Sequence, residues 1–204
     1  MNLETHWEAV FTAKEPTEVS WYRAHLETSI RLIERYAQRM SASIIDVGAG
    51  ESTLVDDLLA KGYRDLTILD ISGTAIEATK KRLGADAERV RWIVGDVVEA
   101  PLPPQAFDLW HDRALFHFLI DQSQREAYVR AVGNAVKPGG HAIVSTFGPE
   151  GPAKCSGLEV ARYDAASLHK AFGSRFTLVE SCEEWHRTPW GAPQQFVYCC
   201  IRVD

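Results

Sequence analysis

The feature that most constrains this fold is an apolar run that ends in two glycines, Ile44-Ile45-Asp46-Val47-Gly48-Ala49-Gly50. The β-branched residues predict a short buried strand, and a helix is expected from Ser52 onward. Because glycine lacks a Cβ, Gly48 and Gly50 permit a sharp turn and the close approach of a ligand. The run therefore predicts a nucleotide-binding type of loop between a strand and a helix.

Short β-branched runs alternate with amphipathic helical stretches after residue 43, which is typical of an α/β fold with a mostly parallel sheet. The last two expected strands are separated by a connection that suits a hairpin, so one of them is expected to run antiparallel to the rest. The expected strands are 43–47, 66–71, 90–94, 107–111, 141–147, 175–181 and 194–202. The expected helices are 25–40, 52–61, 73–83, 122–136 and 164–172.

Composition places the chain in the ordinary globular class. It has 204 residues, 46% of them hydrophobic and 25% charged, which suits one domain with its own core. The net charge of −6 and the lack of a long basic run argue against nucleic acid as a partner. No apolar run approaches the roughly 20 residues of a membrane span, and the first residues lack a leader pattern. We therefore expect a cytoplasmic protein with no membrane partner.

Cysteine and histidine spacing bears on metal binding. The four cysteines include no Cys-x-x-Cys pair, and the histidines show no local ligand spacing. No metal site and no disulfide framework is expected. Cys155 is placed on a loop near the substrate, with a structural role as the main interpretation, while Cys199 and Cys200 are expected to face opposite sides of a strand.

Two residues near the glycines argue against a dinucleotide. A dinucleotide fingerprint would have a third glycine at position 53, which is Thr53. Asp46 brings negative charge toward the ligand, which disfavours a pyrophosphate and suits a ligand that carries an ammonium and a sulfonium. A nicotinamide-dependent oxidoreductase is disfavoured on these grounds.

Carboxylates also follow the next two expected strands. Asp70 ends the second strand, twenty residues after Gly50, where it can accept both hydroxyls of a ribose, and Ile71 is assigned to the same site. Ser72 is a suitable N-cap for the following helix, so Asp70 is not needed as a cap. Asp96 follows the third strand, where it can accept the amino group of adenine while the next N–H, at Val97, donates to the ring.

Together these motifs resemble the class I S-adenosylmethionine-dependent methyltransferases, over about residues 40–147. The resemblance implies S-adenosylmethionine as cofactor and a Rossmann-like, seven-stranded, mostly parallel sheet with a reversed last strand and helices on both faces. Ser52 stands where many members have a third glycine and is kept as a cofactor-binding residue. The matching segments are 46–50, Asp70, Asp96, 107–109 and 137–140.

The resemblance also implies a division of the chain. We expect one methyltransferase domain, residues 1–204. Within it, residues 1–40 are an N-terminal arm and helix, residues 41–147 the cofactor-binding core, and residues 148–204 a substrate-side loop with the C-terminal strands.

Two narrower resemblances point to different acceptors. Residues 107–115 are similar to a segment of thiopurine and thiol methyltransferases, in which an Asp-Arg pair lies beside the acceptor. Residues 62–72, together with Trp21-Tyr22, are instead similar to the lysine methyltransferases that modify elongation factors. The sequence thus leaves a small molecule and a protein lysine open as acceptors.

The acceptor should meet residues just after the fourth and fifth strands, because ligands of open α/β sheets lie beyond the carboxyl ends of the strands. Asp112, Arg113 and His117 are the candidate catalytic residues, and His111 is assigned to the cofactor. Arg113 would stabilise a thiolate and a histidine such as His117 would remove a proton, whereas Asp112 would suit an amine. The alternative is that Asp112 and Arg113 only tie loops together by salt bridges.

Aromatic residues are frequent at the start of the chain. Trp7, Phe11, Trp21 and Tyr22 indicate either a lid or docked arm, or ordinary packing. Trp21 and Tyr22 are assigned to the methionine end of the cofactor, where they would exclude water.

The function expected from the sequence is methyl transfer from S-adenosylmethionine to a small molecule, such as a thiol or other heteroatom nucleophile. No inserted segment is available to shape a macromolecular docking surface. The alternatives are a protein lysine methyltransferase, whose basic target an acidic chain would attract, and a non-catalytic protein that binds S-adenosylmethionine. The sequence does not determine the oligomeric state.

Overall fold

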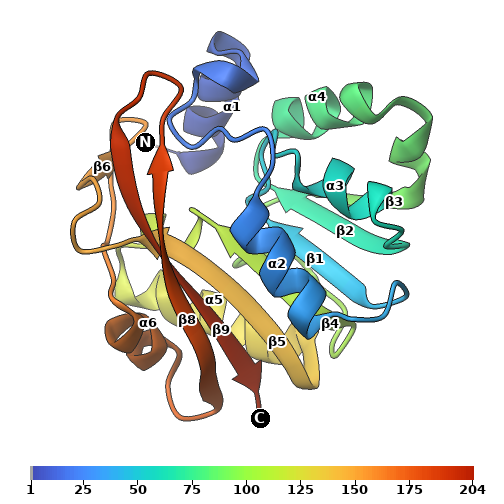
Figure 1. Cartoon of the computed structure of the whole chain (residues 1–204), viewed down its shortest axis with the longest axis vertical. Coiled ribbons are helices and arrows are strands. Elements are labelled where there is room, and N and C mark those ends of the chain that lie inside the picture. Colours follow the sequence, from blue (N-terminus) through green and yellow to red (C-terminus); the bar gives the residue numbers. More distant parts are fainter. Residues whose placement is uncertain (1) are drawn as a thin grey trace.

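The computed structural model describes residues 2–204, and a seven-stranded sheet with helices on both faces forms its centre (Figure 1). The strand order is β3-β2-β1-β4-β5-β9-β8. β9 is antiparallel to β5 and β8, while the other pairs are parallel, which confirms the expected α/β sheet with a reversed last strand. The strands are β1 Ser43–Val47, β2 Asp65–Asp70, β3 Val90–Val94, β4 Phe107–Arg113, β5 Val136–Phe147, β8 Phe176–Arg187 and β9 Pro193–Val203, with a small separate pair β6 Lys154–Cys155 and β7 Leu158–Glu159.

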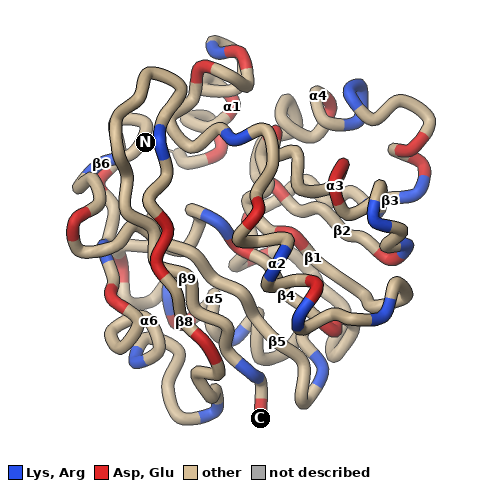
Figure 2. Tube along the Cα trace, viewed as in Figure 1, with Lys and Arg blue, Asp and Glu red and all other residues tan. Residues whose placement is uncertain are grey.

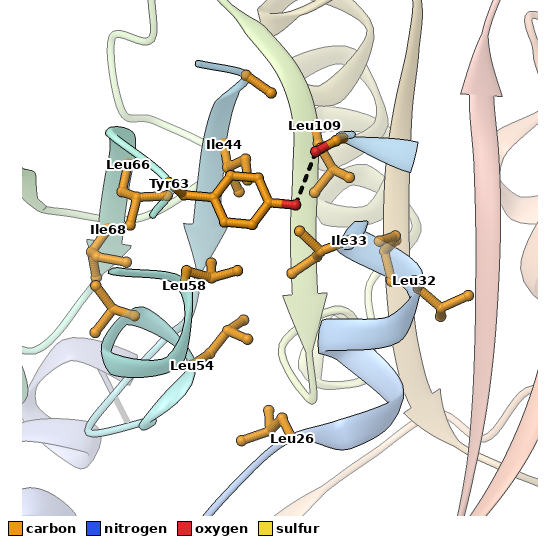
Figure 3. Packing of buried hydrophobic residues seen from close by; sticks show 14 of the residues in the cluster. Leu26, Leu32, Ile33, Ile44, Leu54, Leu58, Tyr63, Leu66, Ile68 and Leu109 are labelled. Carbon is orange, nitrogen blue, oxygen red and sulfur yellow. Dashed lines mark hydrogen bonds between the residues drawn. The ribbon is translucent and has the colours of Figure 1, made fainter. Parts of the chain in front are cut away.

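The helices pack on the two faces of the sheet. The face covered by α2 and α3 buries Leu32, Leu58 and Ile44 in one apolar cluster (Figure 3). The face covered by α5 and α6 buries a second cluster. The α-helices are α1 Leu3–Ala13, α2 Glu27–Tyr36, α3 Leu54–Ala60, α4 Gly73–Leu83, α5 Gln122–Ala135 and α6 Ala165–Phe172, and the short 3₁₀ turns are η1 Pro16–Glu18, η2 Gly84–Arg89 and η3 Phe116–Phe118.

Neighbouring residues of a strand face opposite clusters, as the twofold period of a strand requires. Ile44 belongs to the first cluster and Ile45 to the second. Cys200 and Cys199 divide in the same way, and both are buried, which confirms the prediction that they face opposite sides. Central strands such as β1 and β9 are therefore buried on both faces, as in other α/β folds.

β5 and β8 extend furthest beyond their expected bounds. β5 was expected to begin at His141, but it begins at Val136 because Val136 pairs with Phe107 of β4. An irregularity in the pairing of β4 with β5 accommodates the glycines that follow Val136. β8 was expected to end at Ser181 and continues to Arg187, paired with β9 along its length. The β8–β9 connection is thus a short hairpin turn rather than a long loop.

Helix boundaries differ by a few residues at the loops. The helix expected over 25–40 is α2, which covers only Glu27–Tyr36, and the helix expected over 52–61 begins at Leu54. Ser72 caps α4 as predicted, since its hydroxyl accepts from the Ala75 N–H at 3.2 Å. α1 was not predicted as a helix. The described residues include no helix long and apolar enough to cross a membrane.

Replacement of Tyr63 tests the first core cluster. The Tyr63 side chain is fully buried, and its hydroxyl donates to the Ala37 carbonyl at 2.9 Å (Figure 3). We expect Tyr63→Phe to lower the free energy of unfolding by about 1–2 kcal/mol, because a buried carbonyl loses its donor. Urea unfolding measures the change. An unchanged midpoint would contradict the assigned bond.

Candidate active site

A pocket lies where the carboxyl ends of β1, β2 and β4 meet the N-terminal arm. This edge includes the β1–β4 boundary, where the strand order reverses, the usual place for a ligand in an open α/β sheet. The volume, open mouth included, is about 1250 Å³. The pocket brings together all of the residues predicted to bind the cofactor, namely Trp21, Tyr22, Asp46, Gly48, Gly50, Ser52, Asp70, Ile71, Asp96, Val97 and His111.

The glycine loop has the conformation that its sequence predicts. Gly48 and Gly50 have φ values of +62° and +54°, in the left-handed region that other residues rarely adopt. A Cβ on Gly48 would lie 2.5 Å from the Leu115 side chain, and one on Gly50 would lie 2.8 Å from the Phe11 ring. The loop is therefore glycine both for its dihedral angles and for the close approach of its neighbours.

Asp70 joins the loops that follow β1 and β2. One carboxylate oxygen accepts from the Gly50 N–H at 2.6 Å and the other from the Ser72 N–H at 2.8 Å. Burial raises the pKa of Asp70 to about 6, although both N–H donors oppose the rise. A carboxylate has about four acceptor positions, so hydroxyl groups of a ligand can still bind the ionised side chain.

The loop after β3 forms another part of the wall. Asp96 is half-buried and accepts from the Val98 N–H at 3.0 Å, which closes a turn, while the Val97 side chain is buried. The Gly95 N–H donates to the Asp70 carbonyl at 2.9 Å. Asp46 near the end of β1, Asp70 at the end of β2 and Asp96 after β3 thus lie along one edge of the sheet.

His111 lies in a buried polar chain rather than free in the pocket. Its Nδ1 is 2.7 Å from Asp46 Oδ1, and its Nε2 is 2.9 Å from the Ser29 hydroxyl. All three side chains are nearly inaccessible. One carboxylate oxygen of Asp46 is therefore already hydrogen-bonded to His111. Sequence reasoning missed Ser29, because nothing in α2 distinguishes it from a helix-surface serine.

Arg113 lies at the other end of the pocket wall. Its Nε donates to the Tyr198 hydroxyl at 3.1 Å, its Nη1 donates to the Trp21 carbonyl at 3.0 Å, and its guanidinium lies 4.5 Å from the centroid of Phe196. Nη2 has no hydrogen-bond partner among residues 2–204, and the nearest carboxylate, on Glu184, is 3.9 Å away. Arg113 therefore has a buried Nη2 without a hydrogen-bond partner, in a side chain that is only 5% exposed.

Asp112 lies on the opposite face of β4, and the structure does not bring it to the pocket. Its carboxylate accepts from Tyr128 at 2.6 Å and from the Leu115 N–H at 2.9 Å, within the second core cluster. Burial raises its pKa to about 7. The prediction that Asp112 contacts the acceptor is withdrawn, because adjacent residues of a strand face opposite sides and Arg113 faces the pocket.

His117 is likewise placed behind the pocket wall. The Phe147 N–H donates to its Nδ1 at 3.2 Å, and burial lowers its pKa to about 3. A histidine with this pKa is a weak base at neutral pH, so the structure does not support a catalytic role for it. Cys155 does line the pocket, but burial raises the pKa of its thiol to about 11, so the thiol stays neutral.

The N-terminal arm closes one side of the pocket. The ring of Trp7 contacts Trp21 and Phe118, with centroids 5.9 and 5.1 Å apart, and Phe11 packs over Gly50. Glu8 of α1 accepts from the Gly73 N–H at 2.5 Å, at the start of α4. The aromatic residues noted in the sequence therefore belong to a docked arm that forms part of the pocket wall.

Comparison with known sequences identifies the type of domain. Residues 44–140 match the family model described as a methyltransferase domain. The eEF1A lysine and N-terminal methyltransferase of Mus musculus is 23% identical over 141 residues, which is 66% of this chain and 20% of that protein. An uncharacterized methyltransferase of Mycobacterium tuberculosis is 34% identical over 104 residues, which is 51% of this chain and 50% of that protein. The chain thus spans a fifth to a half of the length of these relatives.

Solved structures share the whole fold. The protein solved in work on the conversion of a disulfide bond into a thioacetal group during echinomycin biosynthesis has a TM-score of 0.81 at 19% identity, covering 100% of this chain and 93% of that chain. The 1,6-didemethyltoxoflavin-N1-methyltransferase of Burkholderia thailandensis, bound to 1,6-didemethyltoxoflavin and S-adenosylhomocysteine, has a TM-score of 0.70 at 20% identity, covering 99% of this chain and 88% of that chain. At these identities the likeness shows the fold alone.

The pKa of Asp70 predicts how cofactor affinity depends on pH. Protonation removes acceptor positions from the carboxylate, so we expect the affinity for S-adenosylhomocysteine to fall as pH is lowered through about 6, by up to about tenfold per pH unit. Calorimetric titration between pH 5 and 8 measures this. Asp70→Asn is expected to bind weakly without that pH step. The same step in the variant would assign it to another group.

The pKa of Asp112 predicts how the stability of the fold depends on pH. The pKa of Asp112 in the folded protein is about 7, above the usual 3.8. The Asp112 side chain therefore contributes most to the stability of the fold at low pH, and this contribution is lost as pH rises through 7. We expect the stability difference between wild type and Asp112→Asn to change in this direction, by about 1 kcal/mol per pH unit between pH 5 and 7. Urea unfolding at each pH checks it. A pH-independent difference would show that Asp112 is ionised throughout.

Proposed function

The chain belongs to the class I S-adenosylmethionine-dependent methyltransferases, and from this premise we propose that it transfers a methyl group to a small-molecule acceptor, such as a thiol or another heteroatom nucleophile. The observation that carries the proposal is a single pocket wall that runs from the glycine loop and Asp70 to Arg113. Arg113 lies in that wall as its cationic side chain.

The proposed cofactor end uses the loops after β1, β2 and β3. Asp70, with Ile71, would bind the ribose hydroxyls, and Asp96 with the Val97 N–H would bind adenine. Asp46 and the glycine loop, with Ser52, would hold the methionine end, where negative charge stabilises an ammonium and a sulfonium. His111 would act there through Asp46, and Trp21 and Tyr22 would exclude water. The cofactor supplies a methyl group on a positively charged sulfur.

The proposed acceptor end combines one cation with aromatic side chains. Trp7, Trp21 and Phe118 line the pocket near Arg113. A guanidinium stabilises the anion of a thiol or similar group and so lowers its pKa, which favours attack without a general base. Holding the acceptor atom about 3 Å from the methyl carbon supplies much of the acceleration of such an in-line displacement. The carboxylate that an amine acceptor would favour, Asp112, faces away.

A protein lysine is the second candidate acceptor. The names of the eEF1A lysine methyltransferases among the relatives favour it, although the chain covers only 20% of that mouse protein. The net charge of −6 is compatible with a basic target. Figure 2 shows acidic and basic residues interspersed along the chain. A cytoplasmic location and a single domain stay predictions.

Binding and transfer assays on matched arginine variants test the proposal. We expect saturable binding of S-adenosylmethionine and none of NAD, and methyl transfer to members of a panel of aliphatic and aromatic thiols. Arg113→Met should leave the cofactor affinity within about twofold and reduce kcat/KM for the acceptor by about 10- to 100-fold, as expected for a lost charge-assisted hydrogen bond.

Arg39→Met is the matched control, because Arg39 is 76% exposed and pairs only loosely with Asp108. This variant should change neither the cofactor affinity nor kcat/KM for the acceptor. Transfer of the methyl group to lysate proteins but to no small molecule would favour a protein lysine as the acceptor. Binding without transfer to any acceptor would favour a non-catalytic protein, and preference for NAD would contradict the proposal.

A further inference from the structure

The strand β8 forms one edge of the seven-stranded sheet (Figure 1). β9 pairs with it from Phe176 to Arg187, and the described residues place no strand on its other side. An edge strand presents a row of unpaired backbone N–H and C=O groups, which pair readily with another extended segment. β8 has 12 residues, whereas β3 at the opposite edge has 5. The β8 edge therefore offers the larger share of this free pairing capacity.

Large apolar side chains are exposed along this edge. Val179 and Trp185 of β8 are 45% and 52% exposed, and Trp190, in the turn that follows β8, is 63% exposed. Natural edge strands are commonly protected by lysine or proline, and β8 contains neither. Exposed apolar residues on an unprotected edge are typical of an interaction surface.

The part of β8 beyond its bulge has regular strand geometry. The register of β8 against β9 shifts between Leu178 and Glu180 and is continuous from Glu180 to Arg187. A bulge twists an edge locally and disfavours further pairing there. The segment from Glu180 onward, with Val179 beside it, is thus the part of the edge that a partner strand can use.

A second copy of this edge can add as an antiparallel strand around a twofold axis. In a twofold dimer one surface contacts its own copy, so residue i meets residue j and j meets i. The axis must be perpendicular to the sheet for the two strands to lie side by side and antiparallel. Every residue then keeps its face of the sheet, and one residue lies opposite its own copy.

The side chains of β8 select the residue at the axis. Like charges directly opposite each other destabilise a sheet, which disfavours an axis at Glu183 or at the glutamate that follows it. An axis at Ser181 would place Val179 opposite Glu183 of the second copy. An axis at Cys182 instead brings Val179 to Trp185 of the second copy and Ser181 to Glu183, so that the exposed apolar residues cover each other.

The same register brings Glu180 opposite Glu184 of the second copy. Both carboxylates are already paired within their own chain, since Glu180 lies 2.7 Å from Arg35 Nη1 and Glu184 lies 3.0 Å from Arg23 Nη1. Each glutamate thus has its own cation nearby, and the repulsion between the two is reduced.

We propose that β8 is a dimer interface, at which two copies of the chain pair their β8 strands antiparallel about Cys182 to form one continuous sheet. The occupant of the edge is a second copy because this arrangement covers Val179 and Trp185 with each other and brings no unpaired like charges together. The inference does not depend on the acceptor of the methyl group.

Sedimentation velocity over a series of protein concentrations tests the interface. We expect the wild type to form dimers, and Trp185→Lys to weaken self-association by about tenfold or more, because lysine on an edge strand opposes pairing. Ile120→Lys is the matched control, since Ile120 is also 52% exposed and lies outside β8. It should leave self-association unchanged.

Disulfide cross-linking tests the register without a charge on the edge. Ser181→Cys and Glu183→Cys are each made in a Cys182→Ser background, mixed, and mildly oxidised. Directly opposite residues have Cα atoms about 4.5–5.5 Å apart, within the range of a disulfide, whereas diagonal neighbours are about 7–8 Å apart. The mixture should therefore form cross-linked dimers about tenfold faster than either variant alone.

Each outcome decides a part of the inference. A wild type that is monomeric at every concentration would overturn the dimer, and an extended segment of another protein would then be the remaining occupant of the edge. Self-association of Trp185→Lys equal to that of Ile120→Lys would show that another surface forms the dimer. Equal cross-linking in the mixture and in the separate variants would overturn the register about Cys182.

Discussion

The hydrogen bond from the Gly50 N–H to the buried Asp70 carboxylate is the contact on which the glycine-loop end of the pocket depends. It spans 2.6 Å and joins the loops that follow β1 and β2. The second Asp70 oxygen accepts from Ser72, which also caps α4. Because β1 and β2 are parallel neighbours, their loops lie at one edge of the sheet, and a single carboxylate can order both. The left-handed glycines make this approach possible.

Side chains alternate along β4 between the pocket and the core under α5. His111 and Arg113 belong to the pocket face, whereas Trp110 and Asp112 belong to the core under α5. Trp110 donates to Tyr128, which donates to Asp112, so the second face is stabilised by its own polar contacts. Two adjacent residues of one motif therefore have different roles, because a strand turns successive side chains to opposite sides.

The pocket wall around Arg113 is assembled from distant parts of the chain. Arg113 of β4 is held by Tyr198 of β9 and by the backbone of Trp21 in the arm. The antiparallel pairing of β9 with β5 places Tyr198 opposite Ser145, next to β4. The reversed last strand thus has a direct consequence for the site: it supplies the hydroxyl that fixes the guanidinium.

The sequence by itself determined the order of the seven strands of the main sheet and of the α-helices from α2 onward, the reversed last strand and the loops that line the pocket, because each depends on a local pattern of glycines, carboxylates and apolar periods. It placed the end of β4 at His111, two residues early, and so could not separate Asp112 from Arg113 by strand alternation. Only the tertiary structure decided that Asp112 and His117 lie behind the pocket wall, that Ser29 contacts His111, and that Tyr198 holds Arg113. These contacts join residues more than 60 positions apart, and no local period records which distant side chain completes a buried hydrogen bond.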